Sequence, residues 1–125
     1  MRRFLFLIIT GVFLAGICFS CFDSEDIKIS VTDSDDTYEF YAKFDKSKSR
    51  EIQNFINMKI TPNRIITDKN LNITTTLNDN TQFELKESPG KIRIKLDKED
   101  NSVASYIRIK KMCEGIKGII SKKKS

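Results

Sequence analysis

The spacing of the apolar residues constrains the fold of this chain more than any other feature of the sequence. In five segments apolar residues alternate with polar ones, so every second side chain lies on the same side. This period of two is typical of half-buried β-strands. The residues expected to face inward are Ile27, Ile29 and Val31 in the first segment, Tyr38, Phe40, Ala42 and Phe44 in the second, Leu71, Ile73, Thr75 and Leu77 in the third, Phe83 and Leu85 in the fourth, and Ile92, Ile94 and Leu96 in the fifth.

Short polar turns connect these segments. The acidic DSDD at residues 33–36 joins the first two segments into a hairpin, and we expect it to be a solvated turn. NDN and SPG join the last three segments into a meander, and the stretch 64–77 holds one strand or two.

Two other segments have helical spacing. Ile52, Phe55, Ile56 and Ile60 form one apolar stripe, with Ser47 or Ser49 as the expected cap and Pro62 as the stop. After a cap at Asn101 or Ser102, a second and longer stripe follows. Its residues are Tyr106, Ile109, Cys113, Ile116 and Ile120, widened by Val103 and Met112. Gly115 and Gly118 are expected to weaken the end of this helix by up to about 1 kcal/mol each.

These elements predict one α+β domain at residues 26–121. Each strand has one apolar face and each helix one apolar stripe. An antiparallel sheet of about five strands, covered on one face by both helices, buries all of these surfaces. The strands are expected in the order hairpin, helix, three-stranded meander and C-terminal helix.

The start of the chain has the layout of a secretory signal. Arg2 and Arg3 precede an apolar stretch at residues 4–17, and the acidic DSED follows at 23–26. A membrane-spanning helix needs about 20 apolar residues, so this stretch is short for one. We expect residues 1–20 to be a signal peptide, with a retained signal-anchor as the alternative.

The residues just before the expected cleavage site resemble the lipobox of bacterial lipoproteins. Cys18, Phe19, Ser20 and Cys21 are similar to the looser form of spirochaetes, in which a bulky residue and a final small one precede the cysteine. This resemblance implies that Cys21 becomes the lipidated first residue. Residues 21–25 are then this cysteine and a short acidic tether. A plain secreted chain is the alternative.

The composition removes most kinds of catalytic chemistry. The chain has no histidine, and so lacks the commonest general base and metal ligand. Cys113 lies on an apolar stripe and is expected to be a core thiol. The acidic turn lacks the residue spacing of a calcium-binding loop. The positions of Glu84 and Glu87 in the sequence do not indicate a pair of catalytic carboxylates for hydrolysis. We therefore predict no enzyme, no catalytic residues, no metal and no cofactor.

The net charge of the whole chain is +5, and basic residues collect near its C-terminus. They are Arg108, Lys110, Lys111, Lys117, Lys122, Lys123 and Lys124. We expect residues 122–125 to form a basic tail. Such clusters bind anionic ligands by summed attraction. The candidate partners are an acidic host ligand, such as a glycosaminoglycan, or anionic lipid, while a solvating tail is the alternative. Nucleic acid is not expected for an exported protein.

The lipobox ICFSC, the acidic FDSED after it and the Ile-, Lys- and Asn-rich body resemble small plasmid-encoded Borrelia lipoproteins, similar to the Borrelia orf-D family. The resemblance implies a cell-envelope protein anchored to the outer membrane and carries over no catalytic residue. Two functions stay open: non-catalytic binding at the cell surface, or a periplasm-facing role in assembly or inhibition of another bacterial protein. The oligomeric state is not predicted.

Overall fold

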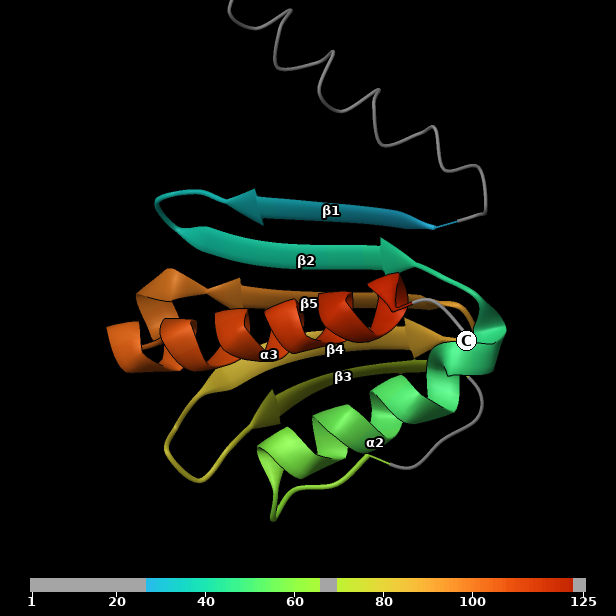
Figure 1. Ribbon diagram of the computed structural model, residues 1–125. Helices are drawn as coiled ribbons and strands as arrows, with labels where there is room; N and C mark the ends of the chain where they lie inside the picture. The colour runs from blue at the N-terminus through green and yellow to red at the C-terminus, as the bar shows by residue number, and fades with distance from the viewer. Residues whose placement is uncertain (1–26, 66–69, 123–125) are drawn as a thin grey trace, which may run out of the picture.

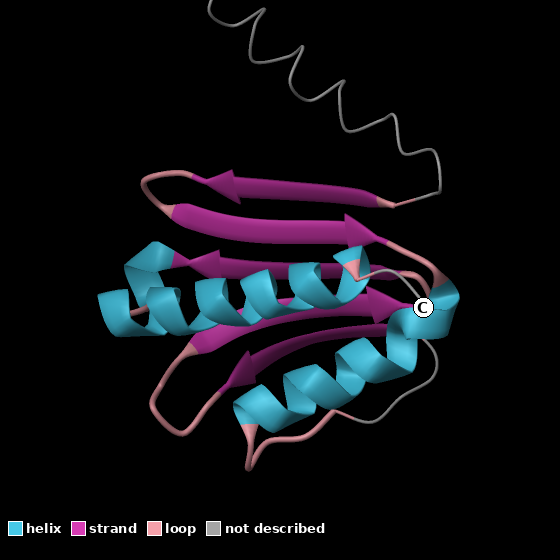
Figure 2. Cartoon of the chain, viewed as in Figure 1, coloured by secondary structure: helices cyan, strands magenta, loops and turns pink. Residues whose placement is uncertain are grey.

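The computed structural model describes residues 27–65 and 70–122, which form a five-stranded antiparallel sheet with two α-helices on one face (Figures 1 and 2). The elements are β1 (Lys28–Asp33), β2 (Thr37–Lys43), the 3₁₀ turn η1 (Lys46–Lys48), α2 (Ser49–Ile60), β3 (Leu71–Thr76), β4 (Gln82–Ser88), β5 (Lys91–Asp97), the 3₁₀ turn η2 (Lys98–Asp100) and α3 (Val103–Ser121). The predicted α+β class, strand number and helix placement are confirmed. The stretch before Leu77 contributes a single strand to the described chain, β3.

The strands lie in the order β1-β2-β5-β4-β3. The β1–β2 hairpin and the β3–β4–β5 meander are both present, and they meet where β2 pairs antiparallel with β5. The sheet is therefore assembled from two local units. The long-range pairing of β2 with β5, between residues 37–43 and 91–97, joins the two units.

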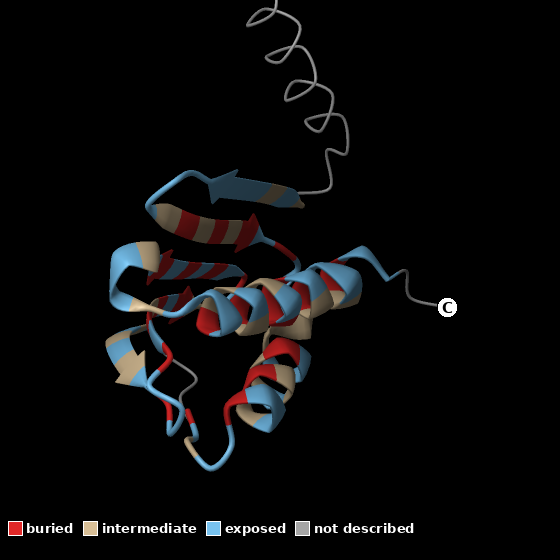
Figure 3. Cartoon of the chain, turned by 90° about the vertical axis from the view of Figure 1, so that its left-hand side faces the viewer, coloured by how far each residue is buried: buried red, intermediate tan, exposed pale blue. Residues whose placement is uncertain are grey.

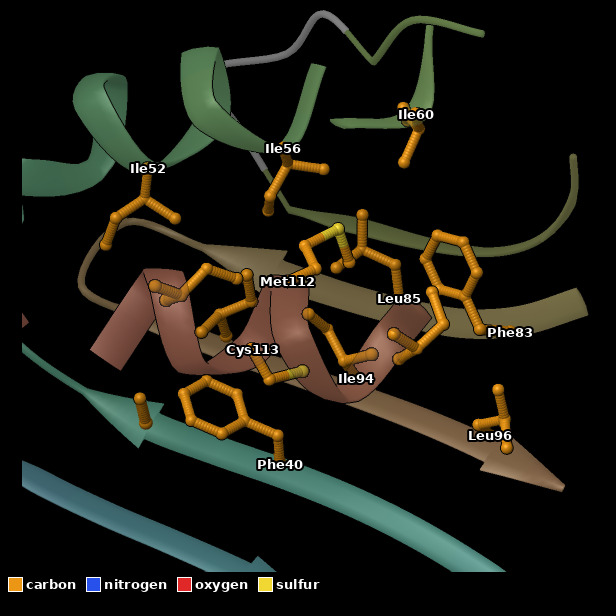
Figure 4. Close-up of a cluster of buried hydrophobic side chains, with 14 of the residues drawn as sticks. Phe40, Ile52, Ile56, Ile60, Phe83, Leu85, Ile94, Leu96, Met112 and Cys113 are labelled. Atoms are coloured by element: carbon orange, nitrogen blue, oxygen red, sulfur yellow. The ribbon is translucent and has the colours of Figure 1, made fainter. Parts of the chain in front are cut away.

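The core lies between the sheet and the two helices (Figure 4). Every inward residue predicted for β2, β4 and β5 is buried, as are the helical residues Ile52, Ile56, Ile109, Cys113 and Ile116. Burying a side chain of this size contributes about 1.5–3 kcal/mol each before the entropy of ordering is counted. The described residues thus bury one continuous apolar core between the sheet and the helices.

Two of the expected inward residues are exposed. Val31 is 48% exposed because β1 is an edge strand and α3 packs mainly on β2 and β5. Figure 3 shows the contrast between β1, which is mostly exposed, and the alternating buried residues of β2. Val103 is 73% exposed in the first turn of α3, so it does not widen the buried stripe, although Met112 does.

The start of α2 differs from the prediction. Neither Ser47 nor Ser49 caps it: the N-cap position is Lys48, which makes no side-chain cap. Asp45 instead caps η1 by accepting from the Ser47 amide, and the Ser49 hydroxyl accepts from the Gly90 amide. The 3₁₀ turn leads directly into the helix, so the cap lies one element earlier than expected.

The start of α3 follows the prediction. Ser102 caps it by accepting from the Ser105 amide. Asn101, the other candidate cap, bonds across to the backbone of Gln82 and so fastens the helix start to β4.

At its far end, α3 is capped by a residue from another part of the chain. Lys48 Nζ donates to the carbonyls of Ile119 at 2.9 Å, Ile120 at 3.1 Å and Lys122 at 2.6 Å. A cation at this position satisfies carbonyls that lack helical partners and favourably meets the negative end of the helix dipole. The helix accordingly continues through Gly115 and Gly118 to Ser121.

Candidate functional site

Within residues 27–65 and 70–122, both helices lie on one face of the sheet and none covers the other. The charged residues of this open face differ between its two ends. Toward the end of β5, one outward lysine has a carboxylate on each neighbouring strand. Lys95 lies directly between Glu39 on β2 and Glu84 on β4. Opposite charges facing each other across strands stabilise a sheet by a few tenths to about 1 kcal/mol. This half of the face is electrostatically complementary.

At the other end of the same strands, like charges face each other. Lys28 lies opposite Lys43, and Lys43 lies opposite Lys91, which puts three lysines in one row across β1, β2 and β5. In the next row Lys86 lies opposite Arg93. Among the described residues, no ion pair neutralises any of the four lysines. We call Lys28, Lys43, Lys86, Lys91 and Arg93 the basic half-face.

An aromatic ring lies within the basic half-face. Tyr41 is paired with Arg93, whose guanidinium lies 5.3 Å from the ring centroid. Glu39 also pairs with this guanidinium, with Arg93 Nε 3.2 Å from Glu39 Oε2. The arginine is therefore fixed over the ring while staying substantially exposed. Arrangements of a cation on a ring at the surface contribute about 0.5–1 kcal/mol.

A shallow hollow of about 270 Å³ opens beside this pair. Its lining comes from β2, β3, β4 and β5 and from the residues next to them: Tyr41, Asn70, Leu71, Asn72, Lys86, Glu87, Ser88, Lys91, Ile92 and Arg93. The lining combines apolar residues and the Tyr41 ring with three basic residues, which suits a ligand that has both a carbon skeleton and an anionic group.

The basic residues predicted near the C-terminus are not gathered into one site. Arg108 pairs with Asp79 at 2.7 Å and donates to the carbonyl of Lys59 on α2, whereas Lys110 approaches Asp33 on β1 at 3.7 Å. These two side chains thus point to opposite sides of α3.

The other basic residues of this predicted set are dispersed as well. Lys111 and Lys117 are exposed, and Lys122 lies 3.7 Å from Glu51. Cys21, Lys123 and Lys124 lie outside the described residues.

The acidic turn is more than a solvated loop, because its first carboxylate joins three elements. Asp33 accepts from Lys98 Nζ at 2.7 Å and from the Tyr106 hydroxyl at 2.6 Å. These bonds, that to Lys98 first, hold the pKa of Asp33 below its ordinary value and raise the pKa of Lys98. The arrangement ties β1 to η2 and α3, and it is a structural contact.

The residues considered for catalysis are poorly placed for it. Cys113 is completely buried, and burial raises the pKa of its thiol to about 12, so it is a core residue as predicted. Glu84 points to the open face and Glu87 to the helix side, so the two carboxylates lie on opposite faces of β4. Within residues 27–65 and 70–122 there is no group of side chains that could hold a metal ion, and no helix long and apolar enough to cross a membrane.

Comparison of the chain with protein-family models, with curated proteins and with solved structures found no match. The site is therefore interpreted from its own geometry. The resemblance to Borrelia orf-D lipoproteins stays a prediction from the sequence.

Proposed function

We propose that this protein is a lipid-anchored, non-catalytic binding protein of a bacterial cell envelope, attached through Cys21 to the outer membrane. The signal-like residues 1–20 and the lipobox-like residues before Cys21 support the anchor. The lack of histidine and the burial of Cys113 support a role in binding rather than catalysis. The spirochaetal lipoprotein family remains part of this proposal.

The ligand is an acidic molecule bound on the basic half-face. One observation carries this assignment: the same sheet face has complementary charges in one half and like charges in the other. Like charges directly opposite each other lower stability. Since the complementary half shows that these strands accommodate opposite charges, the basic half-face costs stability that a bound anion would offset. Tyr41 and the hollow beside it add a surface for the carbon skeleton of the ligand.

The anchor is tested by feeding labelled palmitate to cells that express the chain or its Cys21→Ser variant. Palmitate on the parent and none on the variant, together with loss of the variant from the membrane fraction, is the expected result. Equal fractionation of the two chains would contradict the anchor.

The binding face is tested by titrating the full chain with heparin, used as a probe polyanion, and comparing Lys86→Glu with Lys117→Glu. Both variants change the net charge equally, but Lys117 is on α3, on the other side of the sheet. Lys86→Glu should weaken binding at least tenfold and also raise the free energy of unfolding by a few tenths of a kcal/mol, because it places a carboxylate opposite Arg93. Lys117→Glu should change binding less than threefold. Equal effects of both variants would show that only net charge matters.

A further inference from the structure

The charges of the domain are also sorted between its two ends. One end is formed by the starts of β1 and β5, the end of β2, η1 and the end of α3 (Figure 1). This basic end carries Lys28, Lys43, Lys46, Lys48, Lys91 and Lys122. The described residues of this end also include the acidic Asp45 and Glu51, and Glu51 lies 3.7 Å from Lys122. The sequence that leads into β1, at 23–26, is acidic as well.

The opposite end carries most of the acidic residues. It is formed by the β1–β2 turn, the β3–β4 turn, η2 and the start of α3. Its carboxylates are Asp33, Asp35, Asp36, Asp79, Asp97, Glu99 and Asp100, of which Asp33 and Asp79 have basic partners. The long axis of the sheet is therefore also an axis of charge, from basic to acidic.

The chain enters the domain at the basic end. Lys28 begins β1 and is seven residues after Cys21 in the sequence. Seven residues span at most about 25 Å when fully extended. If Cys21 holds the lipid, as the proposed function states, the basic end is the part of the domain closest to the bilayer. The acidic end lies a whole strand length further away.

We propose that the basic end rests on anionic lipid headgroups, so that the anchored domain stands on the membrane in one orientation with its acidic end outward. This inference depends on the proposed anchor for the orientation. For the contact it depends on the lysines of the basic end other than Lys48, whose ammonium caps α3, and Lys122, which faces Glu51. The attraction of lysines to an anionic surface falls off within about 8–10 Å, which a tether this short allows. Lys28, Lys43 and Lys91 also belong to the basic half-face, so lipid headgroups and the acidic ligand would compete for these three lysines.

The contribution of the lysines is large enough to measure. A lysine near an anionic bilayer strengthens binding by about 1 kcal/mol, which corresponds to about fivefold in the partition coefficient. The best residues to replace are Lys43 and Lys46, because both are exposed and neither caps a helix. Lys48 is left unchanged since its ammonium holds the end of α3.

The orientation is tested with the lipidated full chain in vesicles. A fluorophore is attached to Ser47→Cys at the basic end or to Ala104→Cys at the acidic end, and the quencher is carried by the lipid. Both positions are exposed and neutral, and the buried Cys113 is protected from labelling. In vesicles of 70% phosphatidylcholine and 30% phosphatidylglycerol, quenching at residue 47 should be at least fivefold stronger than at residue 104. The difference should shrink in pure phosphatidylcholine and in 1 M salt.

The variant Lys43→Gln/Lys46→Gln should lose most of this difference, whereas the matched variant Lys59→Gln/Lys111→Gln should keep it. Equal quenching at residues 47 and 104 on anionic vesicles that carry the protein would overturn the proposed orientation while leaving the anchor intact. Failure of the chain to float with pure phosphatidylcholine vesicles would instead overturn the anchor. The contact would still be supported if such a chain bound anionic vesicles and lost about 25-fold in binding through the Lys43→Gln/Lys46→Gln change.

Discussion

The two glycines of α3 should respond in opposite directions to the same substitution. The sequence treats Gly115 and Gly118 alike, as weak points of one helix, but their surroundings differ. A Cβ atom at Gly118 would meet no atom within 4 Å. A Cβ atom at Gly115 would lie 2.3 Å from Phe55 Cζ and 2.8 Å from Phe55 Cε2. The missing side chain at residue 115 is thus what lets α2 and α3 approach each other.

Two opposing effects set the expected changes in the free energy of unfolding: better helix propensity and tighter packing. Gly→Ala inside a helix stabilises by up to about 1 kcal/mol. At Gly118 nothing opposes this gain, so we expect about 0.5–1 kcal/mol and a rise in Tm of about 4 °C. At Gly115 the Phe55 ring must move, and overpacking of this kind costs about 1–3 kcal/mol. Gly115→Ala should therefore lower the free energy of unfolding by about 1 kcal/mol net.

The assay is chemical denaturation of residues 22–125, which contain every described element, for both single variants and the parent. The Phe55→Leu background is the control, because shortening this side chain removes the clash. Gly115→Ala should become neutral or stabilising there, giving a coupling of at least about 1 kcal/mol in the double-mutant cycle. If Gly115→Ala stabilises the parent as much as Gly118→Ala does, the close packing of α2 on Gly115 is refuted.

Three further outcomes are expected. Glu87 is buried, and its Oε1 has no hydrogen-bond partner among the residues that the structure describes. Burial raises the pKa of this carboxyl, so the folded state binds its proton more tightly than the unfolded state does. Protonated Glu87 stabilises the fold fully below the pKa it has in the unfolded chain, and this stability is lost as pH rises through the higher pKa of the folded state. Denaturation at about pH 4 and about pH 8 should therefore show a pH-dependent loss of stability in the parent that Glu87→Gln lacks. The Cys113 thiol, with its pKa raised to about 12 by burial, should react with a thiol reagent at least 100-fold more slowly in the folded than in the denatured chain, and similar rates would contradict its burial. Lys48→Met should destabilise by about 1 kcal/mol and speed amide exchange in the last turn of α3, and unchanged exchange at residues 119–122 would contradict the cap.

Local periodicity was enough to predict the elements because each strand alternates apolar and polar side chains and each helix carries one apolar stripe. The alternation at Phe40 and Ala42, or at Ile92 and Ile94, fixes both the strand and its inward side. The alternation of apolar and polar residues does not reveal which strand lies at the edge of the sheet. Val31 has the same pattern as Phe40, but only the order of the strands decides that no helix covers it.

The candidate site was missed because it is made from residues that are far apart in the sequence. Lys28, Lys43 and Lys91 each look like an ordinary outward lysine on a separate strand. They form a row only through the register of β1 on β2 and of β2 on β5. The C-terminal cluster looked stronger because its residues are close in sequence, yet α3 turns them to different sides. One usable signal existed: the outward positions of the strand at 91–97 begin Lys, Arg, Lys with no acid among them until Asp97.

The sheet register and the order of the charges along it together explain why this fold would suit an anchored binder. Antiparallel pairing brings the start of β1, the end of β2 and the start of β5 to the same end, so lysines at those three positions must share one surface. The same pairing brings the acidic turn and the end of β5 to the other end. Mutual repulsion at the basic end weakens the isolated domain slightly, whereas an anionic surface beside it would convert that repulsion into attraction. This charge arrangement is therefore unfavourable in free solution and favourable beside a polyanion. The proposed attachment at Cys21 would hold the basic end beside such a polyanionic surface.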